Sequence, residues 1–572
     1  MKGVSQVFKK KALLVLLLSA LFMFLVACGG DDSESSAGDD NGSSSDDTGS
    51  SETSNEPVTY HYFIGTAGDD INSNETTIGK KLEDETGVNF QTEYLVGDLM
   101  EKIGVMVAGG EYPDVVVPDH AIEMMLDAEA FIPLNDLLEE HGQNILAMYS
   151  EYIDRFTMPD GNIYYLPLGP TINEHVPNPN IDQGAFWIQR GVLKDAGFPE
   201  INTLDEYLAL IKDYADKNPE IDGMKTVPFT GLTYDTSFFT FSNTPNHLAG
   251  FPNDGSVQID MDTHEATVYA DSDEAKAYLK ALNELNAEGY LDQEMFVMNN
   301  DDFLSKISSG RVLGFFGYGW QWGTARQTLE EAGNPDHEFM ALPVVLEEGI
   351  TDQYLEPAAF TQNRGVGITV NAENPERIIQ YWDRLIEEEM QKLVMWGEEG
   401  THYTVNEEGR FYQTPEQVEL VADQDVRKEF GMTLFEWNWP RLNGTFSDGN
   451  AVEARRQPEV ALETYDEYDR EYLDAYGIQT FSELFSQPQD RPWYPAWSAN
   501  IEQGSDVALF ATRAEELQKR YYPQIVLSDP ANFESEWENF VNEYRSLDGL
   551  EAYENFFTET VKARIEGNWQ YR

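Results

Sequence analysis

Hydrophobic and polar residues are distributed along the chain in blocks whose periodicity indicates strands and helices in turn. Strand-like runs are Thr59–Ile64 and Asn89–Leu95, and a third buried run lies within residues 111–118. Between them, residues 78–87 and 99–108 carry apolar positions at helical spacing, and both stretches are closed by glycine. A β-α-β-α-β series of this kind predicts a parallel sheet and an α/β fold.

A different pattern, aromatic residues at alternate positions, occurs in residues 310–322. Arg311–Phe316 is a nearly continuous apolar run bounded by glycine, which predicts a buried strand. Tyr318, Trp320 and Trp322 follow at intervals of two, and in an extended segment they would point to one side. Ligands in open α/β sheets bind beyond the carboxyl ends of strands, so we predict that these aromatics line a ligand cleft. The alternative, that they fill a hydrophobic core, stays open.

The first residues have the pattern of an export signal, in which a lysine-rich start precedes the apolar run Ala12–Ala27. This run ends in Leu-Val-Ala-Cys-Gly, and Cys28 is the only cysteine of the chain. The sequence here resembles a bacterial lipobox, in which the cysteine becomes the diacylated N-terminus. We therefore expect residues 1–27 to be a lipoprotein signal peptide and Cys28 to be the lipid anchor; a buried structural thiol is the alternative. A single cysteine excludes an internal disulfide and cysteine-based metal sites.

Charge and composition narrow the class of protein. Residues 28–56 are almost entirely serine, glycine and acidic residues, which predicts a disordered acidic tether. The whole chain of 572 residues has 103 acidic and 37 basic residues, a net charge of −66. Nucleic-acid binding needs clustered lysine and arginine, so this balance excludes a nucleic-acid partner. The remaining body exceeds what one hydrophobic core normally supports, so we expect two domains.

Seven short motifs along the body together resemble the extracellular solute-binding proteins of the maltose-binding type (family 1), which are the lipoprotein receptors of ATP-driven sugar importers. The motifs are Ala108–Val116, Phe131–Leu134, Asp160–Pro167, Trp187–Phe198, Asn202–Tyr207, Glu288–Phe296 and Gly397–Tyr403. The last two, and the length, are similar to the long Gram-positive branch that is often linked to complex oligosaccharides. The resemblance covers most of the chain, and the order and spacing of the motifs carry it.

The resemblance implies a two-lobed, periplasmic-binding-protein-like (type 2) fold that closes like a hinge on a ligand between the lobes. Lobe 1 would comprise residues 57–168 and about 355–400, and lobe 2 residues 180–350 and most of 400–572. It also implies a monomer, lipid-anchored on the extracellular face of the cell membrane. Its partners would be a carbohydrate ligand and the permease subunits of an ABC importer, and no cofactor is implied.

One stretch departs from the family pattern. Several members of the long branch carry an EF-hand-like calcium loop after the first helix of lobe 2, and the matching residues here are 218–228. Calcium needs six to eight oxygen ligands, whereas Ile221, Met224 and Lys225 offer no side-chain oxygen. We therefore expect no metal at this loop.

The candidate ligand-binding residues are aromatic and polar side chains near these motifs, because sugars offer an apolar face for stacking and hydroxyls for polar groups. They are Trp320, Trp322, Tyr318, Trp187, Arg190, Asp119, His120, Arg364, Glu399, Trp437 and Trp439. By resemblance, Trp320 aligns with a sugar-stacking tryptophan of the family. Arg190 either binds ligand hydroxyls or a carboxylate, or forms an ion pair within its lobe. The role of Glu399, which shares a family motif with His402, does not follow from the sequence.

The competing function is a surface-anchored, carbohydrate-active hydrolase. Among 103 acidic residues, an acid pair of the glycosidase kind is not excluded by composition. The chain has no His-Glu-x-x-His pair, no Gly-x-Ser-x-Gly motif and no phosphate-binding glycine-rich loop with lysine. The sequence therefore favours a binding protein that is not an enzyme, and leaves open which sugar it binds and whether that sugar is neutral or acidic.

Overall fold

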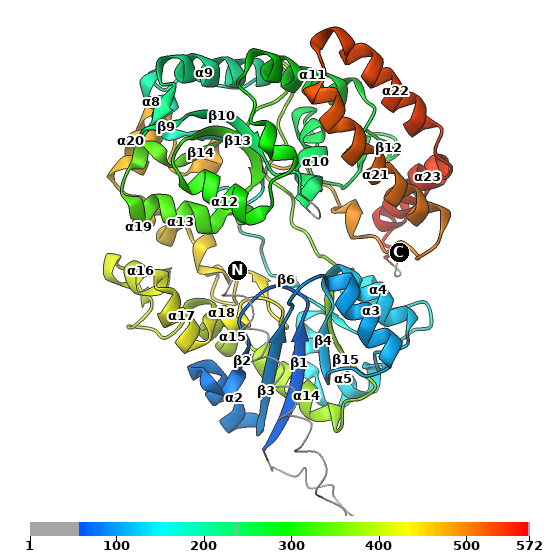
Figure 1. Cartoon of the computed structure of the whole chain (residues 1–572). Coiled ribbons are helices and arrows are strands. Elements are labelled where there is room, and N and C mark those ends of the chain that lie inside the picture. The colour runs from blue at the N-terminus through cyan, green and yellow to red at the C-terminus, as the bar shows by residue number, and fades with distance from the viewer. Residues whose placement is uncertain (1–56, 235–236, 570–572) are drawn as a thin grey trace, which may run out of the picture. The chain divides into compact units, whose positions relative to one another are not determined.

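The computed structural model describes residues 57–234 and 237–569 (Figure 1). In these ranges the chain is α/β, as its hydrophobic pattern predicts, with two main sheets and two large hydrophobic cores. The expected signal peptide, the anchor Cys28 and the acidic tether lie outside the described residues. Within the described ranges, no helix combines the length and the apolar character needed to span a membrane.

The first sheet has six strands in the order β2-β3-β1-β4-β15-β5. Its strands are β1 (Val58–Ile64), β2 (Ile71–Asn72), β3 (Val88–Tyr94), β4 (Val115–Val117), β5 (Leu166–Pro167) and β15 (Gly365–Ile368). β1 pairs in parallel with both β3 and β4, which confirms the predicted parallel series. β15 comes from far along the chain and pairs antiparallel with β4, so the complete sheet is mixed.

The first two helices begin and end where their capping residues require. The side chain of Thr76 accepts a hydrogen bond from the backbone of Gly79 and starts α2 (Thr77–Thr86), and Asp98 starts α3 (Leu99–Gly109) in the same way. Both helices end at a glycine in the left-handed conformation. The two predicted helices, 78–87 and 99–108, are confirmed, and their observed boundaries differ by at most one residue. The agreement is close because the capping residues can be identified in the sequence.

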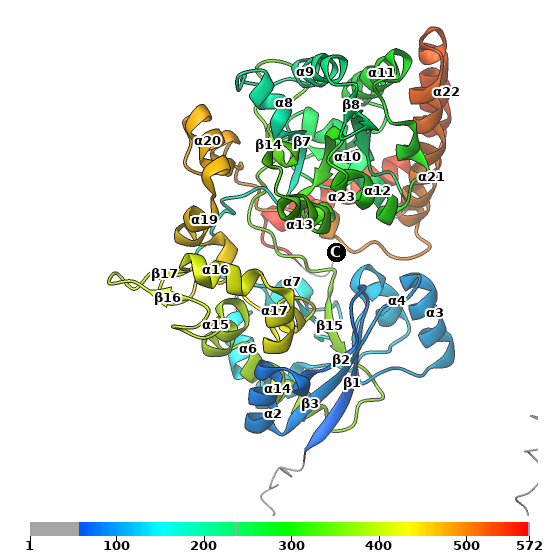
Figure 2. The same cartoon turned by 60° about the vertical axis from the view of Figure 1, so that its left-hand side comes forward.

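Further helices pack in the first core, and in Figure 2 α3 and α4 lie on one side of the first sheet and α2 and α14 on the other. They are α4 (Ile122–Asp127), α5 (Asn135–His141), α6 (Gln143–Met148), α7 (Ile153–Phe156), α14 (Pro375–Leu385), α15 (Glu388–Trp396), α17 (Gln424–Phe430), α18 (Met432–Phe435) and, through Val460, α19 (Pro458–Thr464). α16 (Pro415–Ala422) packs against α17 and α19.

The second sheet has four strands in the order β10-β13-β7-β14. They are β7 (Gly184–Gln189), β10 (Val227–Gly231), β13 (Val312–Tyr318) and β14 (Phe339–Leu342). β13 pairs in parallel with β10 and antiparallel with β7. Every residue of β13 is buried, as predicted for the apolar run that begins at Arg311.

Long helices surround the second sheet, and Figure 1 shows the C-terminal helices α21 and α22 next to α11. The helices are α8 (Arg190–Asp195), α9 (Leu204–Lys217), α10 (Phe238–Leu248), α11 (Asp273–Glu288), α12 (Asn300–Ser308), α13 (Gly323–Ala332), α20 (Glu467–Tyr476), α21 (Asp506–Leu527), α22 (Phe533–Arg545) and α23 (Leu550–Ile565). Small hairpins complete the list, among them β8–β9 (Glu220–Ile221 and Met224–Lys225), β11–β12 (Val257–Ile259 and Ala266–Val268) and β16–β17 (Thr404–Val405 and Phe411–Tyr412).

The residues after position 400 divide between the two cores. Most buried hydrophobic side chains from Tyr403 to Val460 belong to the core of the first sheet, and Tyr472 and most of those from Phe485 to Val561 belong to the core of the second. Ala461, Tyr465 and Leu473 form a small third cluster. A short parallel pair, β6 (Thr171–Ile172) with β18 (Asn443–Gly444), joins the segment that follows β5 to the segment that precedes Phe446. The exact lobe boundaries stay a prediction.

Candidate functional site

The aromatic stretch leaves the second sheet as a 3-10 helix and not as an extended segment. β13 continues to Tyr318, and residues Gly319–Trp322 then form one 3-10 turn, which the side chain of Gln321 closes by accepting a hydrogen bond from the backbone of Tyr318 at 3.0 Å. With three residues per turn, positions two apart point about 120° away from one another. Trp320 is consequently 64% exposed and Trp322 only 1%. The prediction that three aromatics line one side was therefore wrong.

Trp322 and Tyr318 are packing residues of the second core. The ring of Trp322 meets that of Trp187 edge-on at 4.8 Å between centroids, and the guanidinium of Arg326 lies 4.3 Å from its centroid. The hydroxyl of Tyr318 lies 3.2 Å from Nε2 of His247, in the buried interior. Neither side chain is more than 4% exposed, although Trp322 borders the cavity beside β14 that is described below.

Trp320 does offer a free face. One neighbour of its indole is the ring of Phe239, which is nearly parallel at 15° with centroids 6.4 Å apart. Trp320 directly follows the carboxyl end of β13, the location at which open α/β sheets bind ligands. The position predicted from the sequence is thus exposed and aromatic, whereas its two predicted companions are not exposed.

The pair Trp437 and Trp439 is separated in a similar way by its backbone. Asn438 between them has a left-handed φ of 65°, a conformation that non-glycine residues seldom adopt. Trp439 is fully buried and stacks on Tyr62 of β1 at 4.3 Å and 10°, while the Tyr62 hydroxyl donates to the carbonyl of Asn438. Because Trp439 is anchored in this way, Trp437 turns outward and is 45% exposed.

Trp437 lines a groove at the carboxyl ends of β1 and β3. The groove has a volume of about 570 Å³, and its wall includes residues 66–69 after β1 and Tyr94 at the end of β3. The two charged residues of its lining, Asp69 and Lys428, form an ion pair at 2.7 Å. The lining therefore combines an exposed indole with hydroxyl and amide groups, and its one carboxylate is paired.

Three of the predicted residues meet at a second cavity, of about 460 Å³, beside β14. Trp187, Arg190 and Trp322 all line it. Arg190 is 6% exposed and holds the carboxylate of Glu338 at 3.0 Å together with that of Asp469. Burial raises the pKa of Glu338 to about 7, against the opposing effect of Arg190. Of the two roles left open for Arg190, the structure contains the ion pair.

Asp119, His120 and Arg364 lie together beyond the end of β4. The guanidinium of Arg364 donates to the carboxylate of Asp119, and Nδ1 of His120 lies 3.9 Å from the same carboxylate. Asp119 has a left-handed φ of 46°, and such backbone positions cluster at ligand sites. Arg364 also lies over the ring of Trp497 at 5.4 Å. The resemblance predicted Asp119 and His120 in one loop and Arg364 separately, and the fold brings the three together.

Glu399 and His402 belong to the turn that ends α15. Nδ1 of His402 accepts a hydrogen bond from the backbone of Glu398 at 3.0 Å, and the imidazole packs on Phe430 at 4.6 Å. Glu399 is exposed and is not among the residues that line either cavity. The motif Gly397–Tyr403 thus forms the turn that terminates α15, a role that the sequence alone did not indicate.

Sequence analysis missed the two neighbours of the exposed tryptophans. The guanidinium of Arg441 lies 4.2 Å from the ring centroid of Trp437, and Phe239 lies beside Trp320. The spacing of Trp437 and Arg441, four residues apart, is a weak signal for the first contact. The second joins residues about eighty positions apart, and no local pattern indicates it.

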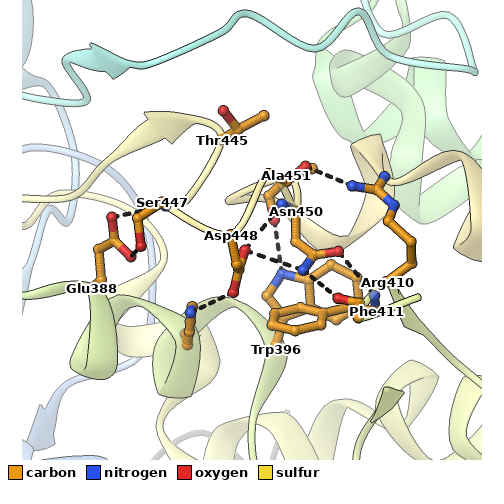
Figure 3. Close-up of polar contacts among 12 residues, drawn as sticks. Glu388, Trp396, Arg410, Phe411, Thr445, Ser447, Asp448, Asn450 and Ala451 are labelled. Atoms are coloured by element: carbon orange, nitrogen blue, oxygen red, sulfur yellow. Dashed lines mark hydrogen bonds and ion pairs between the residues drawn. The ribbon is translucent and has the colours of Figure 1, made fainter. Parts of the chain in front are cut away.

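A polar network fixes the segment that follows Trp437 and Arg441 (Figure 3). The side-chain amide of Asn450 accepts from the backbone of Phe411 at 2.9 Å, and the indole of Trp396 donates to the carbonyl of Ala451 at 2.9 Å. Figure 3 also shows Ser447 bonded to Glu388. Buried hydrogen bonds of this kind hold residues 443–451 against α15 and the β16–β17 hairpin.

The sequence was compared with protein-family models and with known proteins. Residues 77–396, more than half of the chain, match the family model described as bacterial extracellular solute-binding protein. The chain is similar to the fructooligosaccharide ABC transporter substrate-binding protein FusA of Streptococcus pneumoniae, with 26% identity over 249 residues, 41% of this chain and 44% of that protein. A carbohydrate ABC transporter substrate-binding protein of the same organism is 22% identical over 43% of this chain and 47% of that one. The matches thus span less than half of each of these relatives.

Solved structures agree on the fold over most of the chain. The structure of S. pneumoniae FusA in complex with kestose has a TM-score of 0.64 at 17% identity and covers 89% of this chain and 100% of that one. A solute-binding protein from Bifidobacterium longum infantis and the alginate-binding protein AlgQ2 follow with TM-scores of 0.62 and 0.61, each at 15% identity, over 89% of this chain and 99% and 98% of theirs. These neighbours share the two-lobed α/β architecture that the sequence predicted. The chain belongs to the family of bacterial extracellular solute-binding proteins.

Proposed function

We propose that this protein captures an oligosaccharide between its two sheet-bearing lobes as the binding component of an ABC importer. The observation that carries the proposal is the pair of exposed tryptophans, Trp437 and Trp320, each placed beside strand ends of a different sheet. All eleven tryptophans lie in described residues, and these are the only two of them that are exposed. An exposed indole is the platform on which a sugar ring stacks.

The relatives support the class of ligand. FusA and the second pneumococcal relative are named as substrate-binding proteins for fructooligosaccharide and for carbohydrate. In our proposal the ligand touches both tryptophans, so it favours a closed arrangement of the lobes by its differential affinity for that state. The partners are then the permease subunits of the importer, and acylated Cys28 holds the protein at the outer face of the cell membrane as a monomer.

A binding role is preferred over hydrolysis because of the charges in the groove. Glycosidases of the common kinds place two carboxyl groups on either side of the scissile bond. Asp69 is the one carboxylate among the residues lining the groove, and Lys428 neutralises it. Four carboxylates line the other cavity. Arg190 holds those of Glu338 and Asp469, and Asp466 caps the start of α20, so Glu330 is the one that these contacts leave for other partners. We therefore assign no catalytic residues.

A thermal-shift screen across oligosaccharides tests the proposal, with each sugar recovered afterwards and analysed by chromatography. A ligand at a hundred times its dissociation constant adds about 2.7 kcal/mol of stability. The proposal expects stabilisation by at least one oligosaccharide and its recovery intact. Progressive shortening of that sugar would identify a hydrolase instead, and stabilisation by amino acids or peptides alone would refute the carbohydrate assignment.

A further inference from the structure

A cavity at the outer edge of the second sheet has no role in the proposed carbohydrate site. It is the cavity of about 460 Å³ beside β14, which is the last strand in the order β10-β13-β7-β14 (Figure 1). Its lining shares no residue with that of the groove that Trp437 borders. Pockets for small ligands typically have volumes of about 300–1,000 Å³, so this cavity is large enough to hold one.

Arg326 of α13 is a cation without a counter-charge on the wall of this cavity. Its guanidinium lies 4.3 Å from the ring centroid of Trp322 and 5.4 Å from that of Trp187, and such contacts leave its in-plane N–H groups available to a carboxylate. Among residues 57–234 and 237–569 it forms no ion pair, and its one hydrogen bond is donated by Nη2 to the carbonyl of Gly319 at 3.5 Å. Its Nε and Nη1 have no partner there and are not enclosed, so they remain accessible on a residue that lines the cavity.

Glu330, one turn further along α13, is an anion without a counter-charge on the same wall. Its side chain is exposed and, within the described ranges, forms neither a hydrogen bond nor an ion pair. An arginine that precedes a glutamate by four residues is the less favourable order for an ion pair on a helix, and the two tryptophans hold the Arg326 guanidinium. Partial loss of hydration lowers the pKa of this guanidinium and raises that of the Glu330 carboxyl, so an opposite charge from a ligand would stabilise each of them.

The remaining charges of the lining already have partners within the protein. Arg190 is paired with Glu338 and Asp469, and Asp466 accepts hydrogen bonds from the backbone at the start of α20. A purely anionic ligand would meet four carboxylates and only two arginines, and a purely cationic one would leave Arg326 without a counter-charge. A ligand with one charge of each sign supplies what both unpaired groups lack, whereas a neutral sugar supplies neither charge.

We propose that this cavity binds a small zwitterion of the amino-acid class, whose carboxylate contacts Arg326 and whose ammonium group contacts Glu330. The two side chains start one helical turn apart, with about 5–6 Å between their Cβ atoms, a spacing that the two charges of an amino acid can bridge. The apolar part of the lining, Ile181, Leu329 and Met340, contacts an apolar side chain of the ligand. The site lies outside the carbohydrate groove, so this inference goes beyond the proposed function and does not depend on it.

Isothermal titration of the intact protein with matched probes tests the inference. The probes are L-phenylalanine and L-leucine, the same skeletons without the amino group (3-phenylpropionate and 4-methylpentanoate) and without the carboxylate (2-phenylethylamine and 3-methylbutylamine). We expect at least one of the amino acids to bind at least tenfold more tightly than both of its singly charged analogues. Equally tight binding of either analogue, or no binding of either amino acid, would overturn the inference. The proposed function would be unaffected, because oligosaccharides are titrated separately.

Variants test whether the amino acid binds in this cavity. Glu330→Gln, at an exposed position, should weaken binding of the amino acid at least tenfold and that of its anionic analogue less than twofold, because the variant keeps Arg326. Arg326→Gln should weaken binding of both. Glu331→Gln, at the next exposed position of α13 and outside the cavity lining, removes the same charge and should change neither affinity. If Glu330→Gln leaves the affinity for the amino acid unchanged, or if Trp437→Ala abolishes it, the ligand binds elsewhere and the proposal is refuted.

Discussion

The sharpest test of the site compares Trp320→Ala with Trp322→Ala, because the two residues share a 3-10 turn and differ in burial. A buried tryptophan removes up to about 250 Å² from water. Trp320 is 64% exposed, so it buries about a third of that area, and at about 25 cal/mol per Å² its truncation costs at most about 2 kcal/mol of unfolding free energy. Trp322, which is 1% exposed, should cost about 3–5 kcal/mol.

Affinity should respond in the opposite order. Loss of an aromatic platform that contacts ligand costs about 2 kcal/mol or more, which is about thirtyfold in the dissociation constant. Urea unfolding and isothermal titration on the same preparations measure both quantities. Trp320→Ala should lose affinity for the ligand with little loss of unfolding free energy. Trp322→Ala should lose unfolding free energy, and the fraction that folds should keep its affinity. If Trp320→Ala is as unstable as Trp322→Ala and binds normally, the exposed indole is not part of the ligand site.

Four further outcomes are expected. Cys28→Ala should leave unprocessed or shed protein in a membrane fractionation, because acyl chains supply about 0.8 kcal/mol per buried methylene; normal acylation of the variant would contradict the lipobox. A calcium chelator should leave the melting temperature unchanged, because residues 218–228 contain the short β8–β9 hairpin, in which Ile221, Met224 and Lys225 offer no side-chain oxygen; a drop that calcium restores would reveal a working site. Burial raises the pKa of Glu356 and of Glu338 to about 7, so between about pH 4.5 and 7 the folded state binds their protons more tightly than the unfolded chain does. The free energy of unfolding should therefore fall as the pH rises through this window. Glu356→Gln should flatten this pH dependence in urea unfolding, and an unchanged dependence would contradict the assignment. Small-angle scattering should give a smaller radius of gyration with ligand, and an identical profile at saturation would argue against hinge closure.

The hydrophobic pattern predicted the first sheet well because the determinants there are local. Strand runs, capping residues Thr76 and Asp98, and the glycines after α2 and α3 lie within a few residues of the boundaries they set. The family resemblance was likewise carried by short motifs, and the family model that matches residues 77–396 confirms it.

The candidate site was less predictable, because backbone conformations and distant partners decide it. The spacing of two between Trp320 and Trp322 is compatible with a strand or with a 3-10 turn, and the hydrogen bond of Gln321 that closes the turn is not visible in the spacing. The left-handed backbone at Asn438 separates Trp437 from Trp439 in the same way. The exposure of each tryptophan decides whether its indole can contact a sugar, and this exposure depends on the backbone conformation of these turns.

We propose that one oligosaccharide lies between Trp437 and Trp320. Isothermal titration of the wild type, of Trp437→Ala and of Trp320→Ala with the best ligand of the screen measures this most directly. We expect one binding site per chain in the wild type and a loss of about thirtyfold or more in affinity at that same site in each variant. Two independent sites, each lost in only one variant, or a single site that either tryptophan can lose without effect, would contradict it.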